Sequence, residues 1–153
     1  MTDEQLAAFL VQAKRATYAA QGDTASITPL VPGSRQLEFP RGDWLYRDIY
    51  FGFAYFVGQE TVYEKTKPIW AMSYAGGMVE ENEDVLAVNE FLRTALRQVD
   101  VSSPYRGPGL LRGDGFQYTS QTNGTLENFY GIERISRSRA IVYELRYHGG
   151  RLR

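Results

Sequence analysis

The chain has 153 residues, a net charge of −1 and no cysteine. This length fits a single domain, placed here at residues 1–153, and 43% hydrophobic residues are enough to build its core. The lack of cysteine excludes disulfide and thiolate chemistry. No apolar run approaches the roughly 20 residues that cross a bilayer, and the acidic start of the chain has no signal-peptide pattern. We therefore expect a cytoplasmic protein that does not associate with membranes.

The charge is distributed unevenly along the chain. Residues 1–100 carry a net charge of −5 and residues 101–153 carry +4. The small overall charge gives no electrostatic footprint for nucleic acid, so no direct nucleic-acid binding is expected. The asymmetry indicates either complementarity within the protein or an anionic ligand or partner on the second half.

Two amphipathic segments are predicted to be helices. Thr2 and Gln5 form a capping-box pattern before a helix over residues 3–18, in which apolar residues recur at i, i+3, i+4 and i+7. A second apolar stripe predicts a helix over residues 83–99, with acidic residues at its start.

Each predicted helix is followed by a long turn-rich connection and then by strands. The connections are long for a compact domain, which makes them candidates for loops over a site. Alternating apolar and polar residues then predict two hairpins in equivalent places. The connections are 19–36 and 100–112, and the paired strands are 55–64 with 67–75 and 128–136 with 140–148.

The second half of the chain repeats the first. Residues 58–79 align without a gap to residues 131–152, and the five identical positions hold three glycines, a tyrosine and a glutamate. The alignment predicts two pseudo-repeats, approximately 1–80 and 81–153. We therefore expect an α+β fold, a tandem duplication of a helix plus a unit of three to four antiparallel strands. The units would form one curved sheet or half-barrel with the helices on one face.

Glu60 and Glu133 are the first candidates for function. Strand alternation places each of these carboxylates on an otherwise apolar face. A buried carboxylate is costly unless it is paired or hydrogen-bonded, or its pKa rises. They are therefore either structural, held by an arginine or a tyrosine hydroxyl, or they face a cavity as cation ligands or as catalytic acid and base.

Aromatic side chains accompany the carboxylates on the predicted strands. They form either the core of the sheet or the wall of a pocket for a flat organic ligand. Asp48 extends this set, and its counterpart in the second half is Ser120, which makes any site more elaborate in the first half. The predicted ligand-binding residues are Trp44, Tyr46, Asp48, Glu60, Trp70, Tyr74, Glu133, Tyr143 and Tyr147.

The sequence offers no sign of a metal or a cofactor. His148 is the single histidine, so a histidine-rich metal centre is excluded. Neither phosphate-loop nor dinucleotide-binding glycine spacing is present. We expect no metal site and no cofactor.

Several segments together resemble a known family. They are Leu37-Glu38-Phe39, Gly42-Asp43-Trp44, Tyr46-Arg47-Asp48, Tyr50-Phe51-Gly52, Gly58-Gln59-Glu60, Val62-Tyr63, Pro68 to Tyr74 and Val142 to Gly150. The chain is similar over nearly its whole length to the bacterial domain of unknown function 5680. The resemblance implies a domain that occurs alone or behind a repressor-type helix-turn-helix module, a context typical of a sensor. It supplies no catalytic residues, and Ser73-Tyr74-Ala75-Gly76 departs from the family's Asn-Tyr-Tyr-Gly-like pattern.

Three functions remain open from the sequence. The leading hypothesis is a sensor or sequestering protein that binds a small organic molecule between the two repeats. The second is a small acid–base enzyme, a lyase, isomerase or hydrolase, that uses Glu60 or Glu133 with a tyrosine. The third is a protein-interaction module, and a homodimer is possible in each case.

Overall fold

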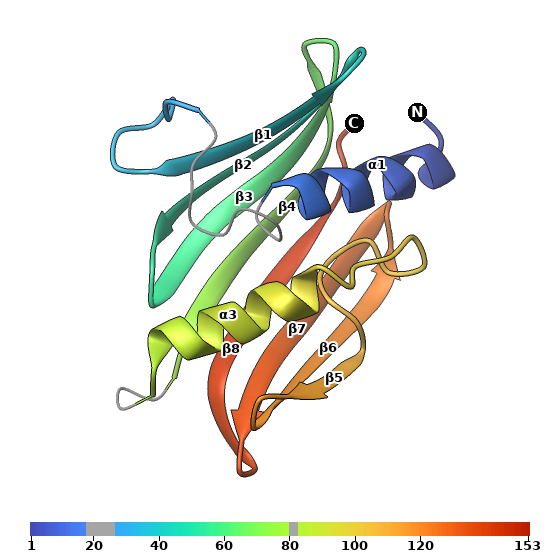
Figure 1. Cartoon of the computed structure of the whole chain (residues 1–153). Coiled ribbons are helices and arrows are strands. Elements are labelled where there is room, and N and C mark those ends of the chain that lie inside the picture. The colour runs from blue at the N-terminus through green and yellow to red at the C-terminus, as the bar shows by residue number, and fades with distance from the viewer. Residues whose placement is uncertain (18–26, 80–82) are drawn as a thin grey trace.

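The computed structural model describes residues 1–17, 27–79 and 83–153. Within these ranges, all strands hydrogen-bond into one eight-stranded antiparallel sheet (Figure 1). The strand order is β1-β2-β3-β4-β8-β7-β6-β5, so two four-stranded meanders meet at the β4–β8 pair. The strands are β1 (Arg35–Arg41), β2 (Trp44–Gly52), β3 (Tyr55–Glu64), β4 (Lys67–Met78), β5 (Leu110–Gly113), β6 (Phe116–Thr125), β7 (Asn128–Arg137) and β8 (Ala140–Arg151).

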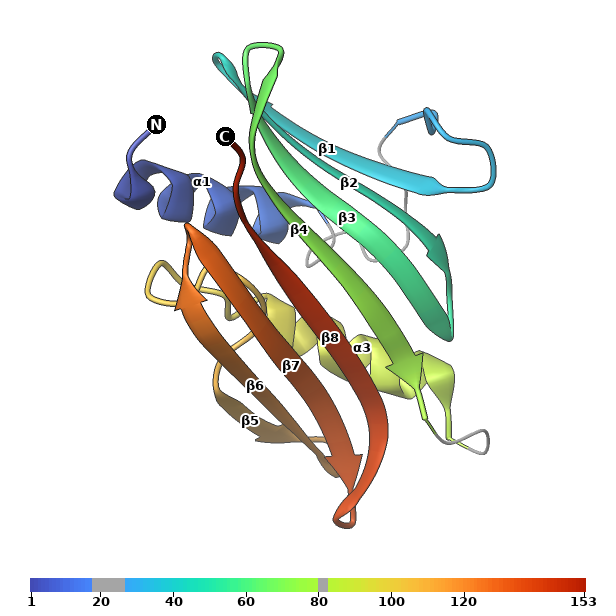
Figure 2. The ribbon, with the colours of Figure 1, turned by 180° about the vertical axis from the view of Figure 1, so that it is seen from behind.

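Two helices cover one face of this sheet. Figures 1 and 2 show α1 (Asp3–Ala16) and α3 (Val85–Leu96) on the same side, and neither of these described helices lies on the other face. The predicted capping box of α1 is confirmed, because Thr2 and Gln5 each accept a hydrogen bond from the backbone of the other. Asp84 caps the start of α3, and its carboxylate accepts hydrogen bonds from two backbone amides of the first turn.

Both predicted hairpins are confirmed, since β3 pairs with β4 and β7 pairs with β8. Of the first predicted connection, 19–36, the structure describes residues 27–36, because residues 18–26 lie outside the described ranges. Residues 100–109 form turns and one isolated bridge between α3 and β5.

The predicted fold class is wrong. Among the described residues 54% lie in strands and only 18% in helices, so the protein is mostly β rather than an α+β tandem repeat of helix-plus-strand units. The physical reason is that six of the eight strands are 9 to 12 residues long and share one hydrogen-bonded sheet. The two helices are short additions that cover this sheet.

Strand alternation sends one set of side chains toward the helices and forms the core there. Trp70, Met72, Tyr143 and Leu145 are fully buried on the two central strands. Helix α1 adds Phe9, and α3 adds apolar residues such as Val88 and Leu92. Arg151 near the end of β8 forms an ion pair with Asp3, which ties the two ends of the chain together.

Candidate functional site

A cluster of charged side chains lies in the core between the sheet and the helices. Glu60 comes from β3, Asp48 from β2, Lys14 from α1, and Arg106 from the loop after α3; Glu133 comes from β7. All five are buried, with between 0% and 7% of their surface exposed. Burial on this scale requires partners for the charges, because an isolated charge in a low-dielectric core is strongly unfavourable.

Glu133 is held by four hydrogen bonds. Arg106 donates to both carboxylate oxygens, from Nε at 3.1 Å and from Nη2 at 2.7 Å. Tyr118 donates to Oε2 at 2.6 Å and Tyr143 to Oε1 at 2.9 Å. The hydroxyl of Tyr118 also accepts from the amide of Gly107 at 2.9 Å, so this network fixes the loop to the sheet. These hydrogen bonds match the structural alternative for Glu133 that the sequence left open.

Glu60 pairs with the helix lysine. Lys14 Nζ donates to Glu60 Oε2, and Arg106 Nη1 lies 4.0 Å from Glu60 Oε1. Burial lowers the pKa of the Lys14 ammonium, an effect that the charge of Glu60 opposes and that of Arg106 strengthens. The two cations of the cluster are thus matched by the two glutamates.

Asp48 is the third carboxylate, and no cation in residues 1–17, 27–79 or 83–153 forms an ion pair with it. It lies directly opposite Glu60 in the β2–β3 register. Its Oδ1 accepts a hydrogen bond from the hydroxyl of Tyr74 at 2.7 Å, and no described residue donates to its Oδ2. Burial, reinforced by the charge of Glu60, raises the pKa of Asp48 from 3.8 to about 7, while Tyr74, Lys14 and Arg106 act in the opposite direction.

The difference between Asp48 and Ser120 has a visible consequence. Tyr74 and Tyr147 face each other across the β4–β8 pair. The hydroxyl of Tyr74 meets Asp48, whereas the hydroxyl of Tyr147 lies 3.0 Å from that of Ser120 and 2.7 Å from that of Thr122. Tyr147 is therefore hydrogen-bonded to neutral hydroxyls, whereas Tyr74 is hydrogen-bonded to an ionisable carboxyl group.

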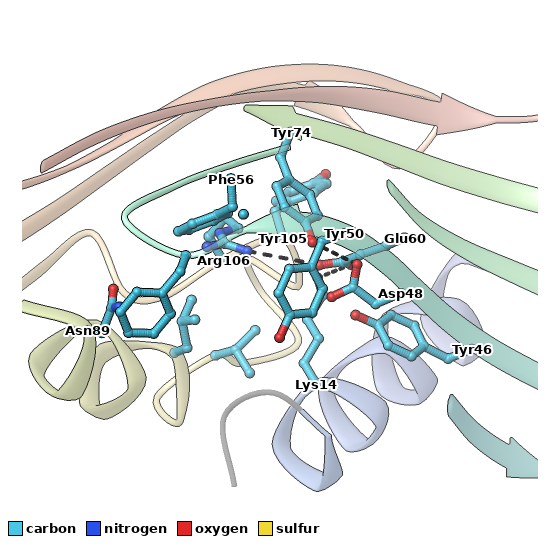
Figure 3. A pocket seen from close by; sticks show the side chains of 14 residues that line it. Lys14, Tyr46, Asp48, Tyr50, Phe56, Glu60, Tyr74, Asn89, Tyr105 and Arg106 are labelled. Carbon is cyan, nitrogen blue, oxygen red and sulfur yellow. Dashed lines mark hydrogen bonds and ion pairs between the residues drawn. The ribbon is translucent and has the colours of Figure 1, made fainter. Parts of the chain in front are cut away.

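A small cavity opens beside Asp48 and Glu60 (Figure 3). Its interior, about 30 Å³, has room for one or two water molecules without rearrangement. Aromatic and charged side chains from α1, β2, β3, β4, α3 and the loop before β5 line it. Its lining includes Lys14, Tyr46, Asp48, Tyr50, Phe56, Glu60, Tyr74, Asn89, Tyr105 and Arg106.

The cavity contains only part of the predicted site. Tyr46, Asp48, Glu60 and Tyr74 line it. The other predicted residues lie elsewhere in the core: Trp44 packs edge-on against Phe9, Trp70 stacks on Phe129, Tyr143 binds Glu133, and Tyr147 binds hydroxyls of β6.

Sequence reasoning missed three polar residues of the cavity. Lys14 falls on the apolar stripe of α1, four residues after Leu10, and Asn89 falls on that of α3; a polar residue at such a position was the available signal. Arg106 lies in a loop without periodicity, and no sequence pattern marks it.

A wider hollow lies on the face of the sheet without helices. It is open to solvent, has a volume of about 600 Å³, and is lined by Phe51, Val57, Arg146 and His148 among others. It contains none of the buried charges, so the enclosed cavity is the better candidate site. No group of three or more His, Asp or Glu side chains among the described residues could hold a metal ion. Neither described helix is long and apolar enough to cross a membrane.

The fold and the cavity define a mostly β protein that encloses a buried polar cluster between one face of an antiparallel sheet and two helices. Residues 48–152 match the family model described as a domain of unknown function (DUF5680), and the chain belongs to this family. The matched range begins at Asp48 and includes Glu60, Arg106 and Glu133; Lys14 precedes it. No curated protein and no solved structure matches the chain.

Proposed function

We propose that this protein binds a small organic molecule in the cavity beside Asp48, as a sensor or sequestering domain. The observation that carries the proposal is a buried carboxylate with no cation partner at the wall of an aromatic cavity. A structural role alone would favour a neutral residue here, because burying Asp48 opposite Glu60 costs stability. A ligand that satisfies Asp48 would recover part of that cost.

The lining gives the ligand two kinds of contact. Tyr46, Tyr50, Phe56 and Tyr74 supply ring surfaces, and Tyr hydroxyls and charged groups fix orientation, as is typical of small-molecule sites. The interior is smaller than a drug-sized molecule, so binding of anything larger than a few atoms requires the walls to move apart. Phe53 at the β2–β3 turn lines the cavity and is 39% exposed, so this part of the wall borders solvent.

The test is a fragment screen by ligand-observed NMR, followed by calorimetry of the hits. Binding should be lost or weakened at least tenfold in Asp48→Asn and in Tyr50→Leu, both of which alter the cavity lining. His148→Gln, on the opposite face, is the matched control and should bind like the wild type. Hits that are insensitive to both cavity variants would refute the assignment, as would a screen without any hit.

A second candidate function is acid–base catalysis by Asp48 with Tyr74. The observation in its favour is that the pKa of Asp48 is raised to about 7, where a carboxyl group can both donate and accept a proton near neutral pH. Glu133 does not fit this role, because four hydrogen bonds saturate it. Incubating each hit with the protein and following its NMR spectrum separates the two functions: a binder remains unchanged, while a substrate is converted in the wild type and not in Asp48→Asn.

A further inference from the structure

The charges around the cavity leave one negative group without a counter-ion. Lys14 pairs with Glu60, and Arg106 pairs with Glu133 at 2.7 Å. Among the described residues, Asp48 accepts a hydrogen bond only from the neutral hydroxyl of Tyr74. With Asp48 ionised, these five groups sum to one negative charge in a space shielded from water. An anionic ligand would add to that charge, whereas a cationic ligand would cancel it.

A second polar group lines the same cavity. Asn89 lies in the apolar stripe of α3 with 5% of its surface exposed. Its amide offers both a hydrogen-bond donor and an acceptor to a bound molecule. Asn89 lines the cavity at some distance from Asp48 in Figure 3, so the two groups mark different parts of its wall.

The aromatic walls already accommodate cations. Lys14 Nζ lies 5.9 Å from the ring centroid of Tyr46, and Arg106 Cζ lies 5.7 Å from that of Tyr74. The faces of such rings attract positive charge, most strongly where water is excluded. Tyr50 and Phe56 add further ring surface around the same space.

We propose that the cavity takes a small organic molecule with a cationic nitrogen group, such as a primary amine. The nitrogen donates to Asp48 Oδ2, the apolar body lies along Tyr50 and Phe56, and a polar end reaches Asn89. The inference rests on the proposed function and names its ligand class. An N–H donor with a positive charge forms a charge-assisted hydrogen bond to a carboxylate, which a neutral hydroxyl cannot match.

The proposal predicts a specific dependence on pH. A protonated amine binds ionised Asp48, and with a pKa of about 7 the ionised fraction rises about tenfold between pH 6 and pH 8. The apparent affinity should rise by the same factor. Asp48 is faced by Glu60 from β3, Lys14 from α1, Arg106 from the loop, and Tyr74 from β4, with Tyr46 beside it on β2. The Asp48→Asn variant isolates its titration from theirs.

The experiment compares benzylamine, benzyl alcohol and benzoate, which share one ring and differ in the head group, by calorimetry at pH 6 and pH 8. At pH 8 benzylamine should bind the wild type at least tenfold more tightly than either of the others. Its affinity should fall about tenfold at pH 6, and Asp48→Asn should reduce it to that of benzyl alcohol at both pH values. Asn89→Leu should leave the preference for the amine unchanged, because none of the three compounds carries a second polar group that could reach Asn89.

Each other outcome overturns the inference. Equal or tighter binding of benzyl alcohol or benzoate would show a cavity that accepts small molecules but does not select a cation. Tight benzylamine binding that survives in Asp48→Asn would place the amine elsewhere. Failure of all three compounds would refute this ligand class, and the proposed function would still stand if the fragment screen gave hits sensitive to Tyr50→Leu.

Discussion

Asp48→Asn should stabilise the protein more at pH 8 than at pH 5.5. The pKa of Asp48 is about 7 in the folded protein and 3.8 when unperturbed, so the folded state holds a proton that the unfolded state has lost between these values. Folding stability therefore falls as pH rises through this window and is constant above it. Between pH 5.5 and pH 8 the titration of Asp48 lowers the free energy of unfolding by about 2 kcal/mol, as follows from its pKa values in the folded and unfolded states.

The assay is urea unfolding of the wild type and Asp48→Asn at pH 5.5, 6.5, 7.2 and 8. The asparagine keeps an oxygen that accepts from Tyr74. The unfolding free energy of the variant minus that of the wild type should increase by about 2 kcal/mol from pH 5.5 to pH 8, with most of the change below pH 7 and a plateau above it. A difference that is independent of pH would show that Asp48 is ionised throughout, and the charge argument for the cavity would then be wrong.

Three further substitutions test the packing around the cluster, each by urea unfolding. Arg106→Met leaves the buried Glu133 without its cation and should lower the unfolding free energy by about 3–5 kcal/mol. The control Arg134→Met breaks a partly exposed ion pair on the same strand and should lower it by about 0.5 kcal/mol. Equal losses in the two variants would contradict the buried network. Gly58→Ala should lower the unfolding free energy by about 2 kcal/mol, because the new Cβ would lie 2.4 Å from the hydroxyl of Tyr74, which donates to Asp48. The control Gly109→Ala should be neutral, since no atom lies within 4 Å of its new Cβ. A Gly58→Ala variant as stable as the wild type would refute the close packing around Tyr74. Trp70→Phe should cost about 1–2 kcal/mol through lost packing, since its buried Nε1 has no hydrogen-bond partner among the described residues, and should leave ligand affinity within about twofold. A large loss of ligand affinity in Trp70→Phe would show that Trp70 belongs to the binding site after all.

The sequence predicted local structure well because local structure depends on local patterns. The capping box at Thr2, the two hairpins and the inward direction of Glu60 and Glu133 all follow from spacing and alternation, and the structure confirms them. The fold class was wrong because the helical patterns, although real, account for few residues beside strands that run for up to 12 residues.

The site was harder to predict because its contacts join distant parts of the chain. Lys14 reaches Glu60 across 46 positions, and Arg106 reaches Glu133 across 27. A lysine on a helix is ordinarily expected to be exposed to solvent, and an arginine in a loop has no periodic pattern that would indicate whether it is buried. The contrast between Asp48 and Ser120 was visible in the sequence, but that it leaves one carboxylate without a cation depends on these long-range pairs.

A carbon-detected NMR titration of the Asp48 carboxyl group, with and without benzylamine, tests the central claim most directly. In the free protein the carboxyl carbon should titrate with a midpoint of about 7. Saturating benzylamine should move that midpoint to lower pH, because the bound ammonium stabilises the ionised form. A midpoint near 3.8 in the free protein, or one that benzylamine leaves unchanged, would contradict the account of Asp48 as the cation-binding group of this cavity.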